Sequence, residues 1–483
     1  MKQLSNKSNK NSNYNVTIQE NSLNNYFSNF ISNQKLGLMA RQSGWKERAS
    51  DFKFAKFVKS FIGYLANARN CTIYGGWINY REHSNDDICY KPFHNKIRKD
   101  QSVAFMMDVA QKLMSTLLSS CVDGKGQMCL KLLKAHGLEI NDIICYDGTY
   151  WTVNESLADS YKGVRSANKE YVEENIYDEN GTPVTNKKKC AQAGLQTEYS
   201  VVKKMFTKVT LTPAVANEKD YVEVDISSPR LYLMDAGYNK LELLQKINDS
   251  GSLYITKARA NCAAIIKHAY INGKEIEHLK ERKLSDKDAR EFRPHSTIDL
   301  DVEFKNGTKA RIIRFKAAKK EFALMLTNIK RSVLSCNLVS DIYRLRWQIE
   351  LEFKQLKSGN NLLGVNTKDE NIMKLFIIGS LCACIVKRLA ILCLSTLTPN
   401  KSISFYRVNM YCDWIKTFIN EVFARNYNRL KKQLKNILEN ISAYIMAKQS
   451  SSKHLLHKTM DSIICNLAKS LMEKGLQLDF FRA

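Results

Sequence analysis

The chain has 483 residues, of which 44% are hydrophobic, so it is long enough to form two to four domains with their own cores. Its 74 basic and 48 acidic residues give a formal charge of +26, a large excess for a soluble enzyme that acts on small molecules. The expected partner is therefore a polyanion, either nucleic acid or an anionic membrane surface, although basicity can also serve solubility.

Neither a structural zinc site nor a membrane span is expected. The 13 cysteines are scattered without paired CxxC units or a CxxC…HxxxH spacing, as in a protein of the reducing cytoplasm. The most apolar run, Leu375–Leu394, is interrupted by Lys387 and Arg388, well short of the roughly 18 uninterrupted residues that a span needs. We expect a buried core helix there, no membrane partner and a cytoplasmic location.

The first 140 residues divide into two expected regions. Residues 1–34 are polar and rich in Asn, Ser and Lys, which predicts a flexible N-terminus. Residues 35–140 predict a small helical domain, because apolar residues recur at helical spacing from Phe54 to Leu65, and further helices fit Val103–Leu118 and Met128–Ala135. The lysines between these apolar residues could contact DNA phosphates or could simply form a solvated face.

Residues 141–257 change to a strand-rich pattern. Short strands are expected at Ile143–Tyr146 and Leu231–Met234, and each runs directly into an aspartate. Further strands are expected near Thr197–Lys203, Thr207–Ala214 and Leu253–Lys257, with a helix at Lys240–Asn248. Several strands followed by alternating helix and strand predict an α/β sheet.

Residues 258–340 interrupt this pattern with a β-rich insertion, in which an Asn306-Gly307 turn predicts a hairpin. Residues 341–396 return to helix and are expected to complete the sheet-containing domain. Residues 397–483 are mostly helical and carry a basic cluster that is a candidate for dimerisation.

The helix Asp341–Gly359 carries the most informative pattern. At about 100° per residue, four charged side chains and one tyrosine share a stripe roughly 80° wide beside an apolar anchor. These residues are Tyr343, Arg346, Glu350, Lys354 and Lys357. The stripe could be a solvated face with i,i+4 ion pairs, or part of a site. Glu352 lies far from the stripe, so its replacement is expected to be mild.

Two strand-end aspartates favour a site. Asp147 and Asp235 each follow an apolar strand, although aspartate also begins turns. Together with Glu350 they would supply three carboxylates for two Mg²⁺ ions, with Mn²⁺ as a substitute, which stabilise the attacking and leaving oxygens of phosphodiester cleavage. Arg346, Lys354 and Lys357 would bind DNA phosphates.

These residues resemble the DDE transposases of bacterial insertion sequences. The spacing Y-x₂-R-x₃-E-x₆-K, from Tyr343 to Lys357, is similar to the Y-R-E-K signature of the insertion-sequence-four family, and both aspartate motifs resemble its strand-end motifs. The resemblance covers about Ile143 to Gly359. It implies a ribonuclease-H-like mixed sheet with a β-rich insertion, flanked by helical N- and C-terminal regions, in which Asp147, Asp235 and Glu350 are catalytic.

The resemblance also implies an activity and partners. It implies cut-and-paste transfer of double-stranded DNA at terminal inverted repeats into target DNA, through a hairpin intermediate, by a homodimer in the bacterial cytoplasm at the nucleoid. It further implies that Tyr343, Arg346 and Lys357 hold DNA near the cut. Residues 258–340 contain no tryptophan, whereas some relatives place one there to stack on a flipped base. The alternatives are a DNA-binding relative without catalysis and a ribonuclease-H-like, structure-selective nuclease.

Overall fold

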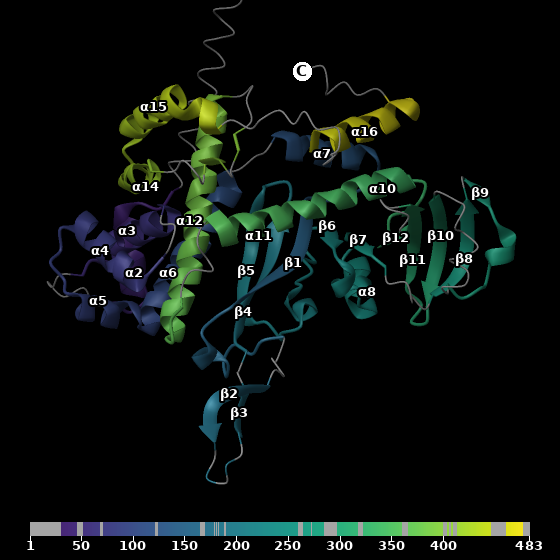
Figure 1. Cartoon of the computed structure of the whole chain (residues 1–483). Coiled ribbons are helices and arrows are strands. Elements are labelled where there is room, and N and C mark those ends of the chain that lie inside the picture. Colours follow the sequence, from purple (N-terminus) through teal and green to yellow (C-terminus); the bar gives the residue numbers. More distant parts are fainter. Residues whose placement is uncertain are drawn as a thin grey trace, which may run out of the picture.

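A computed structural model of the chain shows helices around one large mixed sheet (Figure 1). The structure describes residues 30–45, 52–67, 71–120, 124–164, 170–177, 179, 181, 183–187, 190–258, 264–271, 273–284, 297–316, 322–359, 366–398, 403–404, 407–408, 413–445 and 460–476. The predicted flexible N-terminus, residues 1–34, lies outside the described residues except for its last five.

The sheet has ten strands in the order β5-β4-β1-β6-β7-β12-β11-β10-β8-β9. The pairs β1–β6 and β6–β7 are parallel, and the other neighbouring pairs are antiparallel. The strands are β1 (Ile143–Thr152), β4 (Gln192–Ser200), β5 (Met205–Pro213), β6 (Leu231–Met234), β7 (Leu253–Lys257), β8 (Ala264–Ile271), β9 (Lys274–Glu275), β10 (Thr297–Phe304), β11 (Lys309–Lys316) and β12 (Phe322–Thr327). The predicted α/β fold with a ribonuclease-H-like mixed sheet is confirmed.

The two faces of the sheet belong to two different cores. Successive strand residues point to opposite faces, so Ile143 and Cys145 of β1 join the core beneath α10 (Cys336–Tyr343) and α11 (Trp347–Gly359). Ile144 and Tyr146 join the second core, together with the apolar face of α8 (Leu241–Asp249). The alternation therefore determines which strand residues face α11.

The insertion extends the same sheet. Its last strand, β12, pairs with β7 from Ile255↔Thr327 to Lys257↔Met325, and β11, β10, β8 and β9 follow outwards. The Asn306-Gly307 turn that joins β10 to β11 is formed as predicted, with Gly307 at a φ of 80°. The strands of the insertion and strands β1 to β7 are therefore parts of one hydrogen-bonded sheet.

The N-terminal helices and much of the C-terminal region pack around a single long helix, α12 (Glu370–Leu397). Figure 1 shows α12 standing among these helices beside the sheet. The helices that contact α12 are α3 (Phe54–Asn67), α5 (Tyr90–Ile97), α6 (Asp100–Ser120), α14 (Ile415–Ala424) and α15 (Tyr427–Ile445). Two more, α2 (Asn33–Gln42) and α4 (Ile73–Ser84), pack on α3. By length and composition α12 could cross a membrane, but 89% of its most apolar stretch is buried within the protein, as expected for a core helix.

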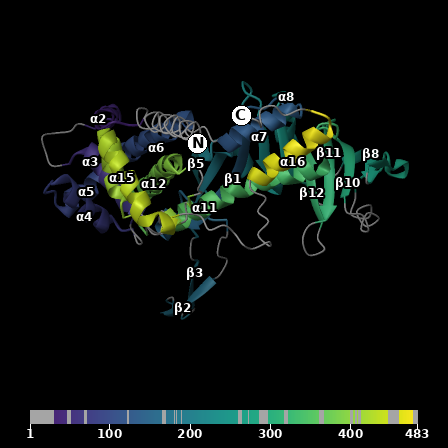
Figure 2. The same ribbon diagram turned by 90° about the horizontal axis from the view of Figure 1, so that it is seen from above.

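Two further features lie outside this helical body. The last described helix, α16 (Met460–Glu473), packs on α7 (Gly124–Ala135) and α10 (Figure 2). A hairpin of β2 (Glu170–Tyr177) and β3 (Pro183–Lys187), which the sequence did not predict, projects away from the sheet in both views. Every cysteine in the described part of the chain is a free thiol.

Candidate active site

Asp147 and Asp235 lie at the same level of two neighbouring strands. The parallel pairing of β1 with β6 places Cys145 opposite Leu233, and each aspartate lies two residues further along its own strand. Because side chains alternate, both aspartates continue the face that packs beneath α11. β6 ends at Met234, and Asp235 caps the short 3₁₀ helix η3 (Ala236–Tyr238) by accepting a hydrogen bond from the Gly237 N–H at 2.6 Å.

Glu350 comes from α11, but the predicted single helix Asp341–Gly359 is wrong at its N-terminal end. The helix α10 ends at Tyr343, a 3₁₀ turn follows at Arg344–Arg346, and α11 begins at Trp347. A 3₁₀ turn winds more tightly than an α-helix, so residues before and after it do not share one wheel. The turn therefore shifts the residues that follow it relative to Tyr343, and Glu350 belongs to α11, a separate helix from α10.

The three carboxylates line one open cavity of about 440 Å³ between the sheet and α11. Its lining residues are Asp147, Gly148, Asp235, Arg346, Glu350, Phe353, Lys354 and Lys357. Of the seven residues predicted for the site, six are thus brought together, from β1, from the end of β6 and from the α11 region. The cavity carries both the acidic groups and three cationic groups.

Arg346 joins two of the three carboxylates. Its guanidinium donates to Asp147 Oδ2 at 3.1 Å and to Glu350 Oε1. Burial alone would lower the pKa of Arg346, but the neighbouring Tyr343, Asp147 and Glu350 raise it overall, so the guanidinium stays charged. Within the cavity this arginine supplies the positive charge that stabilises the carboxylates.

Asp147 remains poorly stabilised as an anion in spite of this ion pair. Burial raises its pKa to about 6, and the negative charges of Asp235 and Glu218 act in the same direction. Arg346 and the Gly148 N–H, which donates to Asp147 Oδ1 at 2.9 Å, only partly offset that effect. Further positive charge at this carboxylate would therefore be favourable.

Tyr343 is buried beside the cavity and contacts the end of β6. Its side chain is 6% exposed, and its hydroxyl donates to the carbonyl oxygen of Met234 at 3.1 Å, immediately before Asp235. This contact ties α10 to the end of β6 and so fixes the backbone next to Asp235. The neighbouring Trp347, which the sequence analysis did not single out, is 45% exposed at the start of α11.

Lys357 is held by the strand that carries Asp147. Its ammonium group donates to the carbonyl oxygen of Tyr150 at 3.0 Å, and burial lowers its pKa. Lys354, one turn earlier on α11, is exposed at the same cavity. The two lysines therefore offer one anchored and one solvent-facing cation.

Glu352 has a role that the helical wheel did not predict. It lies off the stripe, as expected, but it is 5% exposed and forms an ion pair with Arg388 of α12. Its replacement is therefore not expected to be mild. The sequence feature that could have indicated this ion pair is Arg388, a basic residue within the apolar helix α12.

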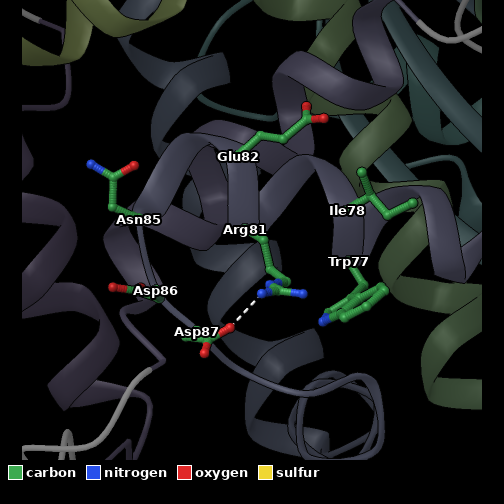
Figure 3. A pocket seen from close by; sticks show the side chains of 7 residues that line it. All are labelled: Trp77, Ile78, Arg81, Glu82, Asn85, Asp86 and Asp87. Atoms are coloured by element: carbon green, nitrogen blue, oxygen red, sulfur yellow. Dashed lines mark hydrogen bonds and ion pairs between the residues drawn. The ribbon is translucent and has the colours of Figure 1, made fainter.

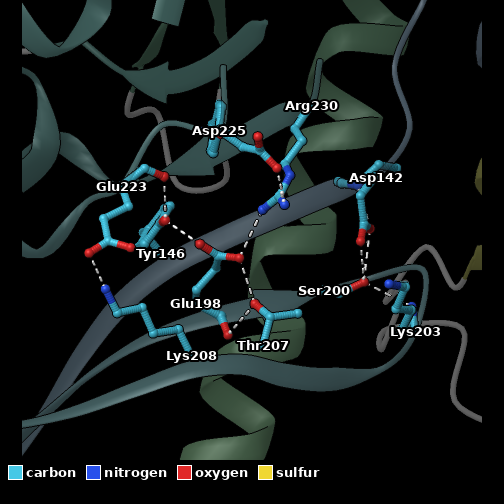
Figure 4. Close-up of polar contacts among 12 residues, drawn as sticks. Asp142, Tyr146, Glu198, Ser200, Lys203, Thr207, Lys208, Glu223, Asp225 and Arg230 are labelled. Carbon is cyan, nitrogen blue, oxygen red and sulfur yellow. Dashed lines mark hydrogen bonds and ion pairs between the residues drawn. The ribbon is translucent and has the colours of Figure 1, made fainter. Parts of the chain in front are cut away.

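A polar network braces the opposite face of β1 (Figure 4). The buried carboxylate of Glu198 accepts hydrogen bonds from Tyr146, from Arg230 at 3.0 Å and from Thr207 at 2.6 Å. Tyr146 precedes Asp147 on the strand, so these contacts fix the backbone from which the aspartate projects. Arg230 also pairs with Asp225, which connects the loop before β6 to the same network.

A second cavity, of about 370 Å³, lies in the helical body around α4 (Figure 3). Its charged lining consists of Arg81, Glu82, Asp86 and Asp87, and the arginine is already paired with Asp87 and lies over the Trp77 ring. The cavity has three acidic side chains and one basic side chain, and the basic one already forms an ion pair. Its net negative charge makes it a poor site for DNA phosphates.

The carboxylates that line the cavity are suitable ligands for a hard divalent cation. Three carboxylates from separate elements offer the oxygen ligands that Mg²⁺ prefers, and Asp147 lacks full compensation for its charge. In the described residues, however, no group of three or more His, Cys, Asp or Glu is arranged to hold a metal. Arg346 forms ion pairs with two of the three carboxylates, Asp147 and Glu350.

Comparison with known proteins identifies the family. Residues 140–386, about half of the chain, match the Transposase DDE domain. The chain belongs to this family of DDE transposases. It is 26% identical over 207 residues to the transposase for insertion sequence element IS1151 of Clostridium perfringens, a match that covers 34% of this chain and 43% of that relative.

Two further relatives match a shorter region. The putative transposase InsL for insertion sequence element IS186A of Escherichia coli K12, and the transposase for insertion sequence element IS421 of E. coli, are each 37% identical over 79 residues. Each match covers 16% of this chain and 21% of the relative. The chain therefore spans less than half the length of the curated relatives that it matches.

Proposed function

We propose that this DDE transposase, of the insertion-sequence-four type, cuts and joins DNA by two-metal-ion chemistry at Asp147, Asp235 and Glu350. The observation that carries the proposal is the convergence of these carboxylates at one cavity that also presents Arg346, Lys354 and Lys357. Acidic ligands for cations and basic contacts for phosphates, side by side, are what phosphodiester cleavage needs.

The proposed roles follow from the contacts. Asp147, Asp235 and Glu350 would hold Mg²⁺ or Mn²⁺, which lowers the pKa of an attacking water and stabilises the leaving oxygen. Arg346 would exchange its carboxylate partners for a DNA phosphate, because a guanidinium binds both groups in the same fork geometry.

The remaining residues hold the DNA and the site. Lys354 and Lys357 would bind phosphates on either side of the cut, and Tyr343 would keep the end of β6 in place. We propose double-stranded DNA with terminal inverted repeats and target DNA as partners, a homodimer as the active assembly, and the bacterial cytoplasm as the location. The charge of +26 supports a DNA partner.

Nicking of a DNA duplex that carries one end of the element tests the proposal. We expect strand cleavage that requires Mg²⁺ or Mn²⁺, followed by joining to target DNA. The variant Glu350→Gln should bind the duplex and give no nicked product. Glu242→Gln is a matched control, because Glu242 is exposed on α8 at the opposite face of the sheet.

The alternative of DNA binding without catalysis draws on one observation. Arg346 spans Asp147 and Glu350, and in the part of the chain that the structure describes no ready-made group of three metal ligands is present. Duplex binding without any metal-dependent nicking would favour this alternative. Cleavage that depends on DNA structure and lacks strand joining would instead indicate a ribonuclease-H-like nuclease.

A further inference from the structure

The helix α15 presents a basic face to the solvent. Its exposed residues recur at spacings of three and four, which places them on one side of the helix. They are Asn428, Arg429, Lys432, Lys435, Asn436, Glu439 and Asn440. Glu439, towards the C-terminal end, is the single acid among them, so the first half of this face carries only basic and amide side chains.

Apolar packing fixes which side of α15 faces outwards. Leu430, Leu434 and Ile437 are buried, and the helix contacts α14 and α12. Gln433 Nε2 also donates to the carbonyl oxygen of Trp414 at the start of α14, at 3.1 Å. α15 lies at the top of the helical body in Figure 1 and in front of it in Figure 2. The basic face is therefore held in one orientation.

The charges on this face do not stabilise the helix itself. Lys435 follows Lys431 by four residues and Lys432 by three, spacings at which like charges repel each other on a helix. Arg429 lies in the first turn, where the helix dipole favours an acid and where α15 has none. A partner that is rich in negative charge would offset both effects.

Neighbouring carboxylates do little to neutralise this face. Glu421 pairs with Arg429 at 3.2 Å, but the side chain of the arginine remains 72% exposed. In the part of the chain that the structure describes, neither Lys432 nor Lys435 has an ion-pair partner. Their ammonium groups are therefore available to an external anion.

A second copy of this chain is a poor partner for the basic face. A two-fold interface brings the same patch of both subunits together. Lys432 and Lys435 would then lie near their own counterparts, and the like charges would repel each other. The dimerisation that the sequence suggests for residues 397–483 would have to use another surface.

We propose that the basic face of α15, from Asn428 to Asn436, binds the phosphate backbone of double-stranded DNA outside the catalytic cavity. This inference rests on the proposed function and assigns its DNA partner to a further surface. The stretch from Arg429 to Lys435 spans about 9 Å at about 1.5 Å per residue, or almost three nucleotide steps of about 3.4 Å each. Contacts to phosphates carry no sequence information, so the face would hold DNA of any sequence.

The salt dependence of duplex binding by the full-length protein tests this assignment. The parent and the double variant Lys432→Ala/Lys435→Ala are titrated at several salt concentrations in chelator, which prevents cleavage. Loss of two phosphate contacts should reduce the slope of log K against log salt by about 2. The reduction should be equal for a duplex that carries one end of the element and for an unrelated duplex of the same length.

Two matched variants separate phosphate contacts from net charge. Lys131→Ala/Lys134→Ala removes two exposed lysines at the same spacing from α7 and should leave the slope unchanged. Lys432→Arg/Lys435→Arg keeps both charges on α15 and should retain the slope of the parent. Melting temperatures verify that each variant is folded.

The possible outcomes are distinguishable. An unchanged slope in Lys432→Ala/Lys435→Ala would overturn the inference and leave the proposed function intact. An equal reduction in the α7 variant would also overturn it, because net charge would then explain the effect. An unchanged slope with a lower dimer mass in sedimentation would assign the face to a second copy instead. If the parent itself bound no duplex, the proposed function would fail together with the inference.

Discussion

The guanidinium of Arg346 lies 3.1 Å from the carboxylate of Asp147 and also contacts Glu350 on its own helix. One positive charge thus holds two of the three acidic groups proposed to bind metal. A divalent cation and Arg346 would compete for the same oxygens, so the arginine must turn towards another anion when metal is bound. A DNA phosphate at the cavity would provide that anion.

The buried position of Asp147 predicts how stability depends on pH in the absence of metal. Its pKa is raised from 3.8 to about 6, so the folded protein binds this proton more tightly than the unfolded chain does. The contribution of Asp147 to stability is therefore full below about pH 4 and is lost as the pH rises to about 6.

The variant Asp147→Asn isolates this effect. In chelator, the unfolding free energy of the parent relative to Asp147→Asn should fall by roughly 2 kcal/mol between pH 4.5 and pH 7.5. Urea denaturation at the two pH values measures it. The same difference at both pH values would show that the folded protein does not favour the protonated carboxyl group. Added Mg²⁺ should protect the parent at pH 7.5 and leave the variant unchanged.

The exposed position of Lys354 predicts a change in the salt dependence of DNA binding. Removing one phosphate contact releases one counterion fewer, so Lys354→Ala should reduce the slope of log K against log salt by about 1. Fluorescence anisotropy across a salt series measures the slope. Lys246→Ala, an exposed lysine of α8 on the other face of the sheet, should leave it unchanged.

The ion pair between Glu352 and Arg388 predicts a large loss of stability. Both side chains are mostly buried, and Glu352→Gln would leave the arginine without its charged partner between α11 and α12. The cost should be about 3 kcal/mol in the free energy of unfolding, measured by urea denaturation. The more exposed pair of Glu370 and Lys374 provides the contrast: Lys374→Ala should cost less than about 1 kcal/mol.

Two glycines of α7 predict opposite effects of the same substitution. A Cβ on Gly126 would lie 2.6 Å from the carbonyl oxygen of Val202, a backbone atom that cannot easily move, so Gly126→Ala should lower the melting temperature. Gly124, two residues earlier, has nothing within 4 Å. Gly124→Ala should be neutral or should stabilise by up to about 1 kcal/mol, because alanine favours helix. Equal melting temperatures for the two variants would contradict the close packing of α7.

Local patterns were sufficient to bring together most of the residues proposed for the site. The apolar runs predict the two strands that lead to Asp147 and Asp235, and the alternation of side chains puts both on the α11 face. The expected strand end at Asp147 is wrong, because β1 continues to Thr152 through its pairing with β4. Arg346 and Glu350 share the predicted stripe at an i,i+4 spacing, and the structure pairs them.

Features that depend on distant partners could not be derived from the sequence. The 3₁₀ turn at Arg344–Arg346 falls within a run that has helical character throughout, so nothing local marks it. The partner of Glu352 lies 36 residues away, in a different helix. The β2–β3 hairpin has a polar sequence, which resembles that of a loop.

The pairing of β12 with β7 has a mechanical consequence for the whole molecule. From β9, the outermost strand of the insertion, to β6, which ends immediately before Asp235, each strand is hydrogen-bonded to the next. DNA that contacted the outer strands would thus be held at a fixed distance from Asp147 and Asp235.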